Sequence, residues 1–536
     1  MTIALSNLGS PCDAARRGAL GAPPREGEVM DRREFMRFSA TTAGLMVIGG
    51  AATGCAPDPA PPTTAFPQGV ASGLHDHQAV VLWTRVEPAV LPVDEVTWLL
   101  STSPDMSEIV AADTVPVSAA SDHTVKVLVE LLDPDRSYWY RFVAGDDTSQ
   151  VESPIGRTRT LPLPSSNPPS LRLAFASCQS FASGWYGAWR DVAARELDAV
   201  VHLGDYIYES PSIQLLRRVR EEPLFEARSV DDYRTKYRHY RADPDLQAAH
   251  AAHPWIIVWD DHELHNDWDR SIIDTDRARY DAAMQAWFEY QPVWPVDGNR
   301  IHRSHRWGRL AQIFMLDERQ YRVPPVDSLF GGGFMGPEAA SPDQTMLGLA
   351  QRAWLLDGIS EASADGVRWN VIGSPQPASP LRVVDLDTPE LRALEATLVK
   401  HAGFYFGMDS WDSYAGERDL ILEHLRSQST AGTTFLSGDI HAFFAGALQA
   451  DFDDDHSPVV AHEFTGGSIA SAPGGPHTAL VEGGGRLSPG FDFVNGTRNG
   501  YGVVEYRPGS ATVTFMGLDP VWPGAMPVPI YSTTIV

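Results

Sequence analysis

The first part of the chain alternates between apolar and polar residues over short stretches that turn-forming residues separate. Four stretches rich in Val, Leu, Trp and Tyr show this period of two, at Ala79–Arg85, Glu95–Ser101, His123–Leu131 and Ser137–Ala144. The period is typical of half-buried strands, so we predict an all-β, fibronectin-like sandwich over residues 66–162. Leu132–Tyr140 has the form of a tyrosine corner, in which a tyrosine hydroxyl braces a turn of such a sandwich. A proline-rich linker follows at Leu161–Ser170.

Beyond the linker the pattern changes to short apolar runs that alternate with amphipathic stretches, as in α/β proteins. A polar cluster follows each run at once; the runs are Leu171–Ala176, Ala199–Leu203, Ile256–Trp259, Ile313–Leu316, Trp369–Ile372 and Thr433–Leu436. The amphipathic stretches predict helices at Trp185–Glu196, Asp281–Tyr290, Gly348–Ile359 and Gly416–Ser427. Open α/β sheets bind ligands beyond the carboxyl ends of their strands, so we expect the polar clusters to converge.

The end of the chain predicts a closing hairpin. Tyr501–Tyr506 and Ala511–Phe515 read as two strands, with Pro508 and Gly509 in the turn between them. We therefore place the end of the α/β domain at residue 515 and expect a C-terminal tail over 516–536.

Composition narrows the range of functions. Hydrophobic residues make up 43% of the chain and charged residues 21%, which are ordinary values for a globular protein and exclude wholesale disorder. The 42 Lys and Arg residues against 69 Asp and Glu give a formal net charge of −27. We expect no specific nucleic-acid binding, because phosphate contacts need a basic face. An anionic substrate would have to be attracted by a local cation such as a bound metal.

The N-terminal segment has the features of an export signal. The twin arginines Arg32 and Arg33 precede the apolar run Phe38–Ala52, which is shorter than the roughly 20 residues of a membrane-spanning helix. We interpret residues 1–29 as a disordered upstream segment, 30–55 as a Tat-type signal that ends in a lipobox-like sequence, and 56–65 as a proline-rich tether. The expected partners are the Tat machinery and, where Cys55 carries lipid, a membrane. The expected location is the cell surface, the periplasm or the exterior.

Acidic residues gather in three of the polar clusters. Asp205, Asp261 and Asp439, the last with His441 close by, each follow a predicted buried strand. A buried carboxylate is costly to desolvate, and several together repel one another unless a cation neutralises them. The three cysteines are too few for a disulfide framework. The sequence therefore predicts a metal centre, although any one of these carboxylates alone could be a helix N-cap or a structural ion pair.

Cys178 and Tyr208 narrow the choice of metal. A thiolate and a phenolate both donate strongly to one ion, which points to ferric iron, whereas carboxylates and the amide of Asn266 suit Ca²⁺. The spacing of Asp205 and Tyr208 on a turn that leaves a strand lets both reach the same ion. Taken alone, Cys178 could be a small buried hydrophobe and Tyr208 an ordinary core residue.

Several segments of the chain, in order, resemble the alkaline phosphatase D (PhoD-like) family of the metallophosphoesterase superfamily. The resemblance is carried by Phe175–Gln179, Gly204–Glu209, Trp259–Glu263 with Asn266 and Asp267, and Ser437–His441. Leu316–Arg322 and Trp411–Arg418 resemble two further segments of the family. Phe66–Gly73 and Leu82–Arg85 resemble the N-terminal part of the family. The resemblance covers about residues 66–515.

The resemblance implies an α/β metallophosphoesterase core of two mixed sheets flanked by helices over residues 171–515, preceded by the sandwich. It places ferric iron on Cys178, Asp205 and Tyr208, with Asp205 bridging to Ca²⁺. It also places Asp261, Asn266, Asp439 and His441 near the metals as further candidate ligands.

The implied activity is that of an exported, metal-dependent phosphoric ester hydrolase, an alkaline phosphatase that cleaves mono- and diesters with a metal-activated hydroxide. His262 or His441 could protonate the leaving group or orient the nucleophile, and Arg319 could clamp phosphoryl oxygens. Each could instead be structural, Arg319 in an ion pair with Asp317 or Glu318. Two alternatives stay open: a dedicated phosphodiesterase acting on nucleic acid, teichoic acid or phospholipid, and a non-catalytic surface binding protein built on the same core.

Overall fold

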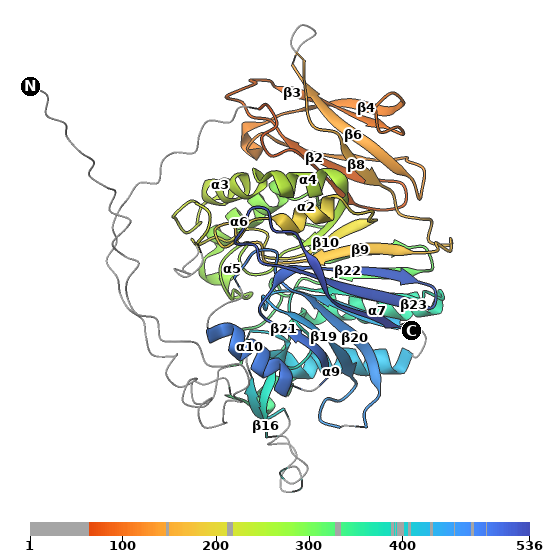
Figure 1. The fold of residues 1–536 in the computed structure, drawn as a ribbon, viewed down its shortest axis with the longest axis vertical. Helices are drawn as coiled ribbons and strands as arrows, with labels where there is room; N and C mark the ends of the chain where they lie inside the picture. The colour runs from red at the N-terminus through yellow and green to blue at the C-terminus, as the bar shows by residue number, and fades with distance from the viewer. Residues whose placement is uncertain are drawn as a thin grey trace, which may run out of the picture. The chain divides into compact units, whose positions relative to one another are not determined.

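Two mixed β-sheets form the centre of the protein in the computed structural model (Figure 1). The structure describes residues 64–536 except for gaps at 146–149, 212–217, 327–333, 387–390, 392, 394–400, 406–408, 429–431, 455, 473–475 and 489. The predicted upstream segment, the export signal with Cys55 and nearly all of the tether lie outside the described residues. None of the helices in the described part of the chain is both long and apolar enough to cross a bilayer.

The first sheet has nine strands in the order β24-β23-β22-β9-β10-β11-β1-β2-β5. Its strands β9, β10, β11 and β1 run parallel, and the others join in antiparallel pairs. Their bounds are β1 (Val70–Leu74), β2 (Val80–Arg85), β5 (Thr124–Val129), β9 (Leu171–Ala176), β10 (Ala199–Leu203), β11 (Pro254–Val258), β22 (Asn499–Arg507), β23 (Ser510–Leu518) and β24 (Val528–Ile535).

The second sheet has seven strands in the order β12-β13-β15-β18-β20-β19-β21, of which β13, β15, β18 and β20 are parallel neighbours. Their bounds are β12 (Arg303–Trp307), β13 (Ala311–Met315), β15 (Trp369–Ser374), β18 (Gly432–Ser437), β19 (Phe443–Gln449), β20 (Val459–Gly466) and β21 (Phe491–Asn495). Both sheets contribute to one buried cluster, which joins Phe175 and Phe515 of the first sheet to Leu436 and Phe464 of the second. The predicted core of two mixed sheets is confirmed.

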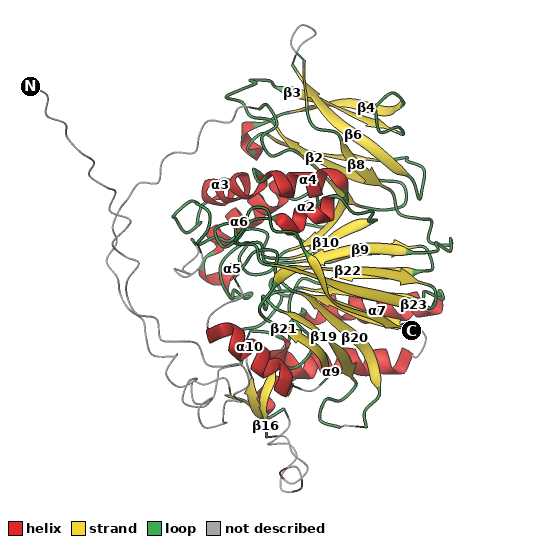
Figure 2. Ribbon diagram, viewed as in Figure 1, coloured by secondary structure: helices red, strands yellow, loops and turns green. Residues whose placement is uncertain are grey.

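Helices cover the outer faces of this pair of sheets (Figure 2). Those beside the first sheet are α2 (Gly187–Ala193), α3 (Val230–Arg241), α4 (Pro244–Ala252), α5 (Ile272–Thr275) and α6 (Arg277–Tyr290). Beside the second sheet lie α7 (Gly348–Ala364), α9 (Ala415–Gln428) and α10 (Pro476–Leu487). Leu355 of α7 and Ile421 of α9 are buried against that sheet. All four predicted helices are present, with shifted ends, whereas α3, α4 and α10 were not predicted.

The N-terminal strands form a second layer that is joined to the core. β3 (Glu95–Ser101), β4 (Ile109–Pro116), β6 (Ser137–Ala144), β7 (Val151–Glu152) and β8 (Gly156–Arg159) make a separate sheet. Trp98 and Tyr140 of this sheet pack on Leu82 and Val127, which belong to β2 and β5 of the nine-stranded sheet. The separate sheet therefore packs on strands that belong to the nine-stranded sheet. Tyr138 braces the predicted corner, where its hydroxyl accepts a hydrogen bond from the amide of Asp133 at 2.9 Å.

The C-terminal segment forms more of the sheet than the sequence pattern indicates. β22 and β23 form the predicted hairpin. Residues 516–536, for which we predict only a tail, complete β23 and add β24 at the edge of the nine-stranded sheet. The reason lies in the pairing with β23: Thr512 lies opposite Thr534, and Thr514 lies opposite Ser532, so polar side chains of the two strands form hydrogen bonds with each other. A three-stranded sheet of β14 (Phe334–Met335), β16 (Arg382–Asp385) and β17 (Gly403–Tyr405) completes the fold.

Candidate metal centre

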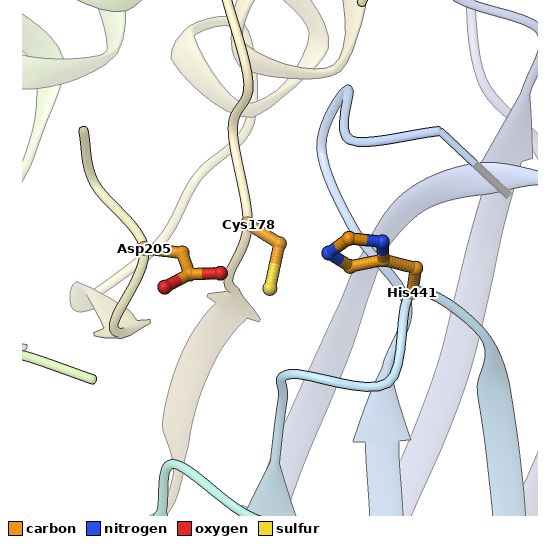
Figure 3. Close-up of side chains that lie close together, drawn as sticks. All are labelled: Cys178, Asp205 and His441. Carbon is orange, nitrogen blue, oxygen red and sulfur yellow. The ribbon is translucent and has the colours of Figure 1, made fainter. Parts of the chain in front are cut away.

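The polar clusters that follow the buried parallel strands meet, as predicted, at the carboxyl ends of those strands. Cys178 follows β9, Asp205 follows β10, Asp261 follows β11, and Asp439 and His441 follow β18. The thiol of Cys178, a carboxylate oxygen of Asp205 and a ring nitrogen of His441 all lie within 4.8 Å of one another. Figure 3 shows these three side chains pointing toward one another from three separate segments.

The backbone of these segments is held in an uncommon conformation. Cys178, Asp205, Asp439 and His441 have positive φ angles of 56°, 57°, 63° and 54°. Non-glycine residues rarely adopt this region, and such residues persist where the surrounding structure fixes them, often at functional sites. The sharp turns let the side chains leave the strand direction and face a shared point.

Tyr208 joins the first group of candidate ligands. Its hydroxyl donates to Oδ2 of Asp205 at 2.9 Å and lies 3.2 Å from Nε2 of His441. Burial and the carboxylate of Asp205 raise the pKa of Cys178 well above its ordinary value. Burial, Asp205 and Cys178 likewise raise the pKa of Tyr208. The ionised forms of these side chains repel one another. A multivalent cation between them would allow them to be ionised together, and the distances between their donor atoms fit such a cation.

A second group contains oxygen donors only. Carboxylate oxygens of Asp260, Asp261 and Asp439 lie within 4.8 Å of one another, and Asp261 is also within that distance of Asp205 and His262. Burial, together with Asp260, raises the pKa of Asp439. Asp261 is the exception: burial would raise its pKa, but Arg319 and His262 hold it well below the usual range. Oxygen donors in this arrangement suit a hard cation.

Asn266 lies at the margin of these groups. It is exposed, and its Nδ2 donates to Oδ2 of Asp267 at 2.6 Å. Its backbone amide points to Oε1 of Glu209 at 3.4 Å. Of the predicted metal ligands, the structure therefore brings six together, and Asn266 is the outermost.

His262 is held by two contacts beside the first group. Its Nδ1 lies 2.7 Å from Oε2 of Glu209, and its ring packs on that of Tyr208 with a centroid distance of 4.2 Å. Burial would lower the pKa of His262, but Asp261, Asp205 and Glu209 outweigh it and raise the pKa well above its ordinary value. The imidazole is thus placed to carry a proton next to the carboxylates.

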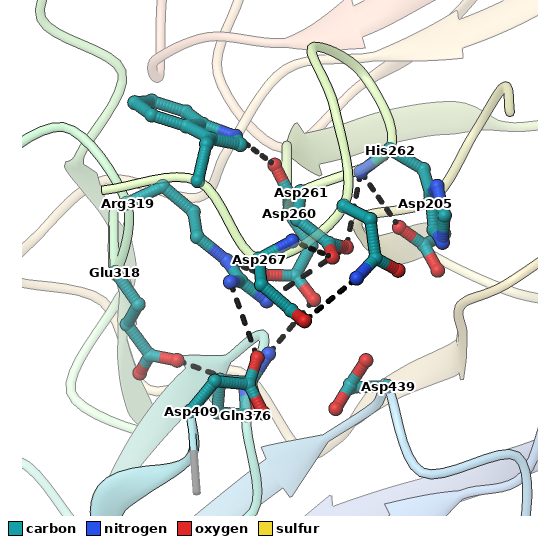
Figure 4. Close-up of polar contacts among 12 residues, drawn as sticks. Asp205, Asp260, Asp261, His262, Asp267, Glu318, Arg319, Gln376, Asp409 and Asp439 are labelled. Carbon is teal, nitrogen blue, oxygen red and sulfur yellow. Dashed lines mark hydrogen bonds and ion pairs between the residues drawn. The ribbon is translucent and has the colours of Figure 1, made fainter. Parts of the chain in front are cut away.

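Arg319 is fully buried beside the second group (Figure 4). Its Nε donates to Oδ1 of Asp260, and its Nη1 donates to Oδ2 of Asp409 at 3.3 Å. Its Nη2 lies 3.7 Å from Asp261. These ion pairs differ from the ones suggested by the sequence. The carboxylate of Asp317 accepts from Trp259, and that of Glu318 from the amide of Gln376.

Besides Asp260 and Glu209, three further residues of the site were not singled out from the sequence. The buried carboxylate of Glu263 accepts backbone hydrogen bonds from Asp205, Tyr206 and Asp260 at 3.1, 2.7 and 2.9 Å. Ser471 contacts the hydroxyl of Tyr208 at 2.6 Å, and Asp409 pairs with Arg319. Glu263 follows Asp261 by two residues in the same polar cluster, so the sequence could have indicated that it belongs to the site. Ser471 and Asp409 carry no local signal, because only the fold brings them to the site.

Comparison with known proteins agrees with this geometry. Residues 173–515 match the PhoD-like phosphatase family, and residues 51–162 match the N-terminal domain of that family. The chain is 32% identical over 476 residues to alkaline phosphatase D of Bacillus subtilis (strain 168), a match that covers 84% of this chain and 78% of the relative.

Two solved phosphatase structures also align with this chain. A structure of PhoD aligns with a TM-score of 0.77 and 30% identity over 89% of this chain and 91% of that chain. The purple acid phosphatase PPD1 from yellow lupin aligns with a TM-score of 0.50 over 87% of this chain and 73% of that one; at 10% identity it shows a shared fold.

The two-sheet core and the paired ligand groups, with these relatives, define a metal-dependent phosphoesterase. The match over residues 173–515 covers more than half of the sequence. The chain belongs to the PhoD-like phosphatase family.

Proposed function

We propose that this enzyme is an alkaline phosphatase that hydrolyses organic phosphomonoesters, releasing phosphate, and also cleaves phosphodiesters. The observation that carries the proposal is the pairing of two donor sets: sulfur, phenol, imidazole and carboxylate around Cys178, and the three carboxylates of Asp260, Asp261 and Asp439. A soft, strongly donating site next to a hard one suits two different cations that share a substrate. The name of the B. subtilis relative, alkaline phosphatase D, supports the same activity.

For the metals we propose Fe³⁺ and Ca²⁺. Cys178, Asp205 and Tyr208 would hold the iron, because a thiolate and a phenolate both stabilise the ferric state. Asp205 would also face the calcium ion, with Asp261 and Asp439. His441 and the outlying Asn266 complete the proposed ligand set. When bound, such ions supply Lewis acidity and an acidified water molecule at neutral pH.

The remaining roles fall to side chains around the ligands. His262, whose pKa Asp261, Asp205 and Glu209 raise, would donate a proton to the leaving alkoxide, while Glu209 fixes its Nδ1 edge. His441 would orient the nucleophile from the opposite segment, within reach of Tyr208. Arg319 would bind the phosphoryl group, and its Nη2 has no hydrogen-bond partner among the described residues.

We also propose that the protein is exported by the Tat route, with Cys55 as a lipid-anchor candidate, and that residues 66–162 form a fibronectin-like domain. The twin arginines and the short apolar run support export. The two β-layers packed around Trp98 and Leu82 support the domain assignment.

Elemental analysis combined with a substrate panel tests the activity. Natively exported protein should contain iron and calcium and should hydrolyse both a phosphomonoester and a phosphodiester. Activity on diesters alone would favour the dedicated phosphodiesterase, and an inert, metal-free protein would favour a binding role on the same core.

Variants of Cys178 test the iron site separately. Cys178→Ser and Cys178→Ala should both lose iron and activity while the protein stays folded. If Cys178 were only a small buried hydrophobe, the alanine variant would keep its iron and its activity, and that result would contradict the ligand assignment.

A further inference from the structure

A buried serine lies behind the phenol of Tyr208. Ser471 follows β20, belongs to no sheet, and is 1% exposed. Its Oγ lies 2.6 Å from the hydroxyl oxygen of Tyr208. The sequence surrounding it, Ser468-Ile469-Ala470-Ser471, carries none of the motifs discussed above. Its position therefore comes from the fold alone.

The surroundings of Ser471 decide which way this hydrogen bond runs. Oγ of Ser471 accepts the backbone amide hydrogen of Ser180 at 2.9 Å. A serine hydroxyl has one proton to give, and the other polar atom that the structure places at Oγ is the oxygen of Tyr208. Tyr208 also has a single hydroxyl proton, and it donates that proton to Oδ2 of Asp205. In the contact between the two hydroxyls, Tyr208 therefore accepts and Ser471 donates.

The serine is fixed in place by its own backbone. Its amide donates to the carbonyl of Cys178 at 3.1 Å. Its carbonyl accepts from Oγ of Ser468 at 2.7 Å and from Nδ2 of Asn499 at 2.6 Å. The same residue thus contacts the main chain of one proposed iron ligand and the side chain of another. Because these contacts already fix Ser471, little further entropy is lost when its hydroxyl is directed at the phenol oxygen.

We propose that Ser471 is a positioning residue of the metal centre: its hydroxyl donates a fixed hydrogen bond to the phenol oxygen of Tyr208 and thereby sets the orientation and donor strength of that ligand. The inference rests on the proposed binding of iron by Tyr208. Hydrogen bonds to a ligand atom from outside the coordination sphere commonly tune the metal in this way. A donor withdraws electron density from the oxygen that binds the ion.

The experiment is visible absorption of the iron-loaded protein. A phenolate bound to ferric iron absorbs visible light by transfer of charge to the metal, so the part of the band that disappears in Tyr208→Phe reports this ligand alone. Ser471→Ala should move that part to longer wavelength, because the phenolate electrons lose the stabilisation of the hydrogen bond. Iron affinity should fall by about 10- to 100-fold.

Band position does not depend on how much iron the protein holds, so partial loading does not hide the shift. Ser471→Gly removes the same hydroxyl and gives a second measurement if the alanine variant folds poorly. Ser468→Ala is the matched control, because it removes a hydroxyl that braces the same segment without touching Tyr208. An unmoved band in the Ser471 variants, or an equal shift in Ser468→Ala, would overturn the role of Ser471. A wild-type spectrum that Tyr208→Phe leaves unchanged would instead overturn the iron assignment itself, and this inference with it.

Discussion

Oε2 of Glu209 lies 2.7 Å from Nδ1 of His262. The carboxylate therefore fixes the Nδ1 edge of the imidazole, and Nε2 is the ring nitrogen that would transfer a proton. Burial would lower the pKa of His262, and Asp261, Asp205 and Glu209 together reverse that effect and raise it. A raised pKa keeps the imidazole protonated up to a more alkaline pH. If the imidazolium is the acid of the reaction, activity is present below this pKa and is lost as the pH rises through it.

Glu209→Gln removes one of the charges that raise this pKa. The alkaline limb of the pH profile of kcat/KM should therefore move to lower pH, and the acid limb should stay in place. The profile of Glu95→Gln, which changes an exposed residue of the N-terminal sheet, serves as the control. An alkaline limb that stays at the same pH in Glu209→Gln would remove His262 from the role of acid.

Glu263 holds two ligand-bearing segments together through three backbone amides. In Glu263→Gln the amide nitrogen must face at least one of these N–H groups, so a buried donor loses its partner. An unsatisfied buried donor costs about 1–3 kcal/mol. We expect the free energy of unfolding of the metal-free protein in urea to fall by about that amount. Metal affinity should fall as well, because Asp205 is no longer held. A variant that unfolds like the wild type would show that these three hydrogen bonds do not stabilise the fold.

Much of the core could be predicted because its signals are local. The apolar runs before Cys178, Asp205 and Asp439 each correspond to a buried strand, and their polar ends do converge. Parallel strands buried on both faces read as continuous apolar runs, which makes them easy to recognise.

The elements that were missed have weaker or different signals. α3 is amphipathic but rich in Arg and Tyr, and it buries Arg234 and Lys236, so its apolar stripe is hard to see. β24 is an edge strand of polar and β-branched residues, whose assignment depends on its partner β23. Ser471 reaches the site through a connection that follows β20, and no spacing rule in the sequence specifies that contact.

Arg319 forms a buried ion pair with Asp260 besides its proposed role in binding the phosphoryl group. Its side chain and that of Asp260 are 0% and 2% exposed, so Arg319→Ala leaves a buried carboxylate without its partner. Breaking a buried ion pair from one side costs about 3–5 kcal/mol. We expect thermal unfolding to show this loss of stability, and kcat/KM of the protein that remains folded to fall as well.

A second buried ion pair separates the two effects. Arg418 and Asp412 lie 2.7 Å apart, and both are buried outside the two ligand groups. Arg418→Ala should lose stability to a similar degree but keep kcat/KM per folded molecule. Arg319→Lys keeps the charge but not the planar fork, so it should restore part of the stability without restoring kcat/KM. Full activity in Arg319→Lys would exclude bidentate binding of the phosphoryl group.

Gly204 is the residue that lets the segment bearing Asp205 pass close to the one bearing Asp260. Its φ is +101°, and a Cβ atom there would lie 2.4 Å from Cβ of Asp260. Gly204→Ala therefore adds a clash to the cost of a left-handed backbone, which alone is about 1–3 kcal/mol. Gly366 has φ of +73° with nothing within 4 Å of such a Cβ, so Gly366→Ala measures the backbone cost alone. In urea unfolding, Gly204→Ala should lose clearly more stability than Gly366→Ala, and only Gly204→Ala should lose bound metal, because the clash must displace Asp205 or Asp260. Equal losses of stability with full metal content in both variants would mean that the two segments can separate without disturbing the ligands.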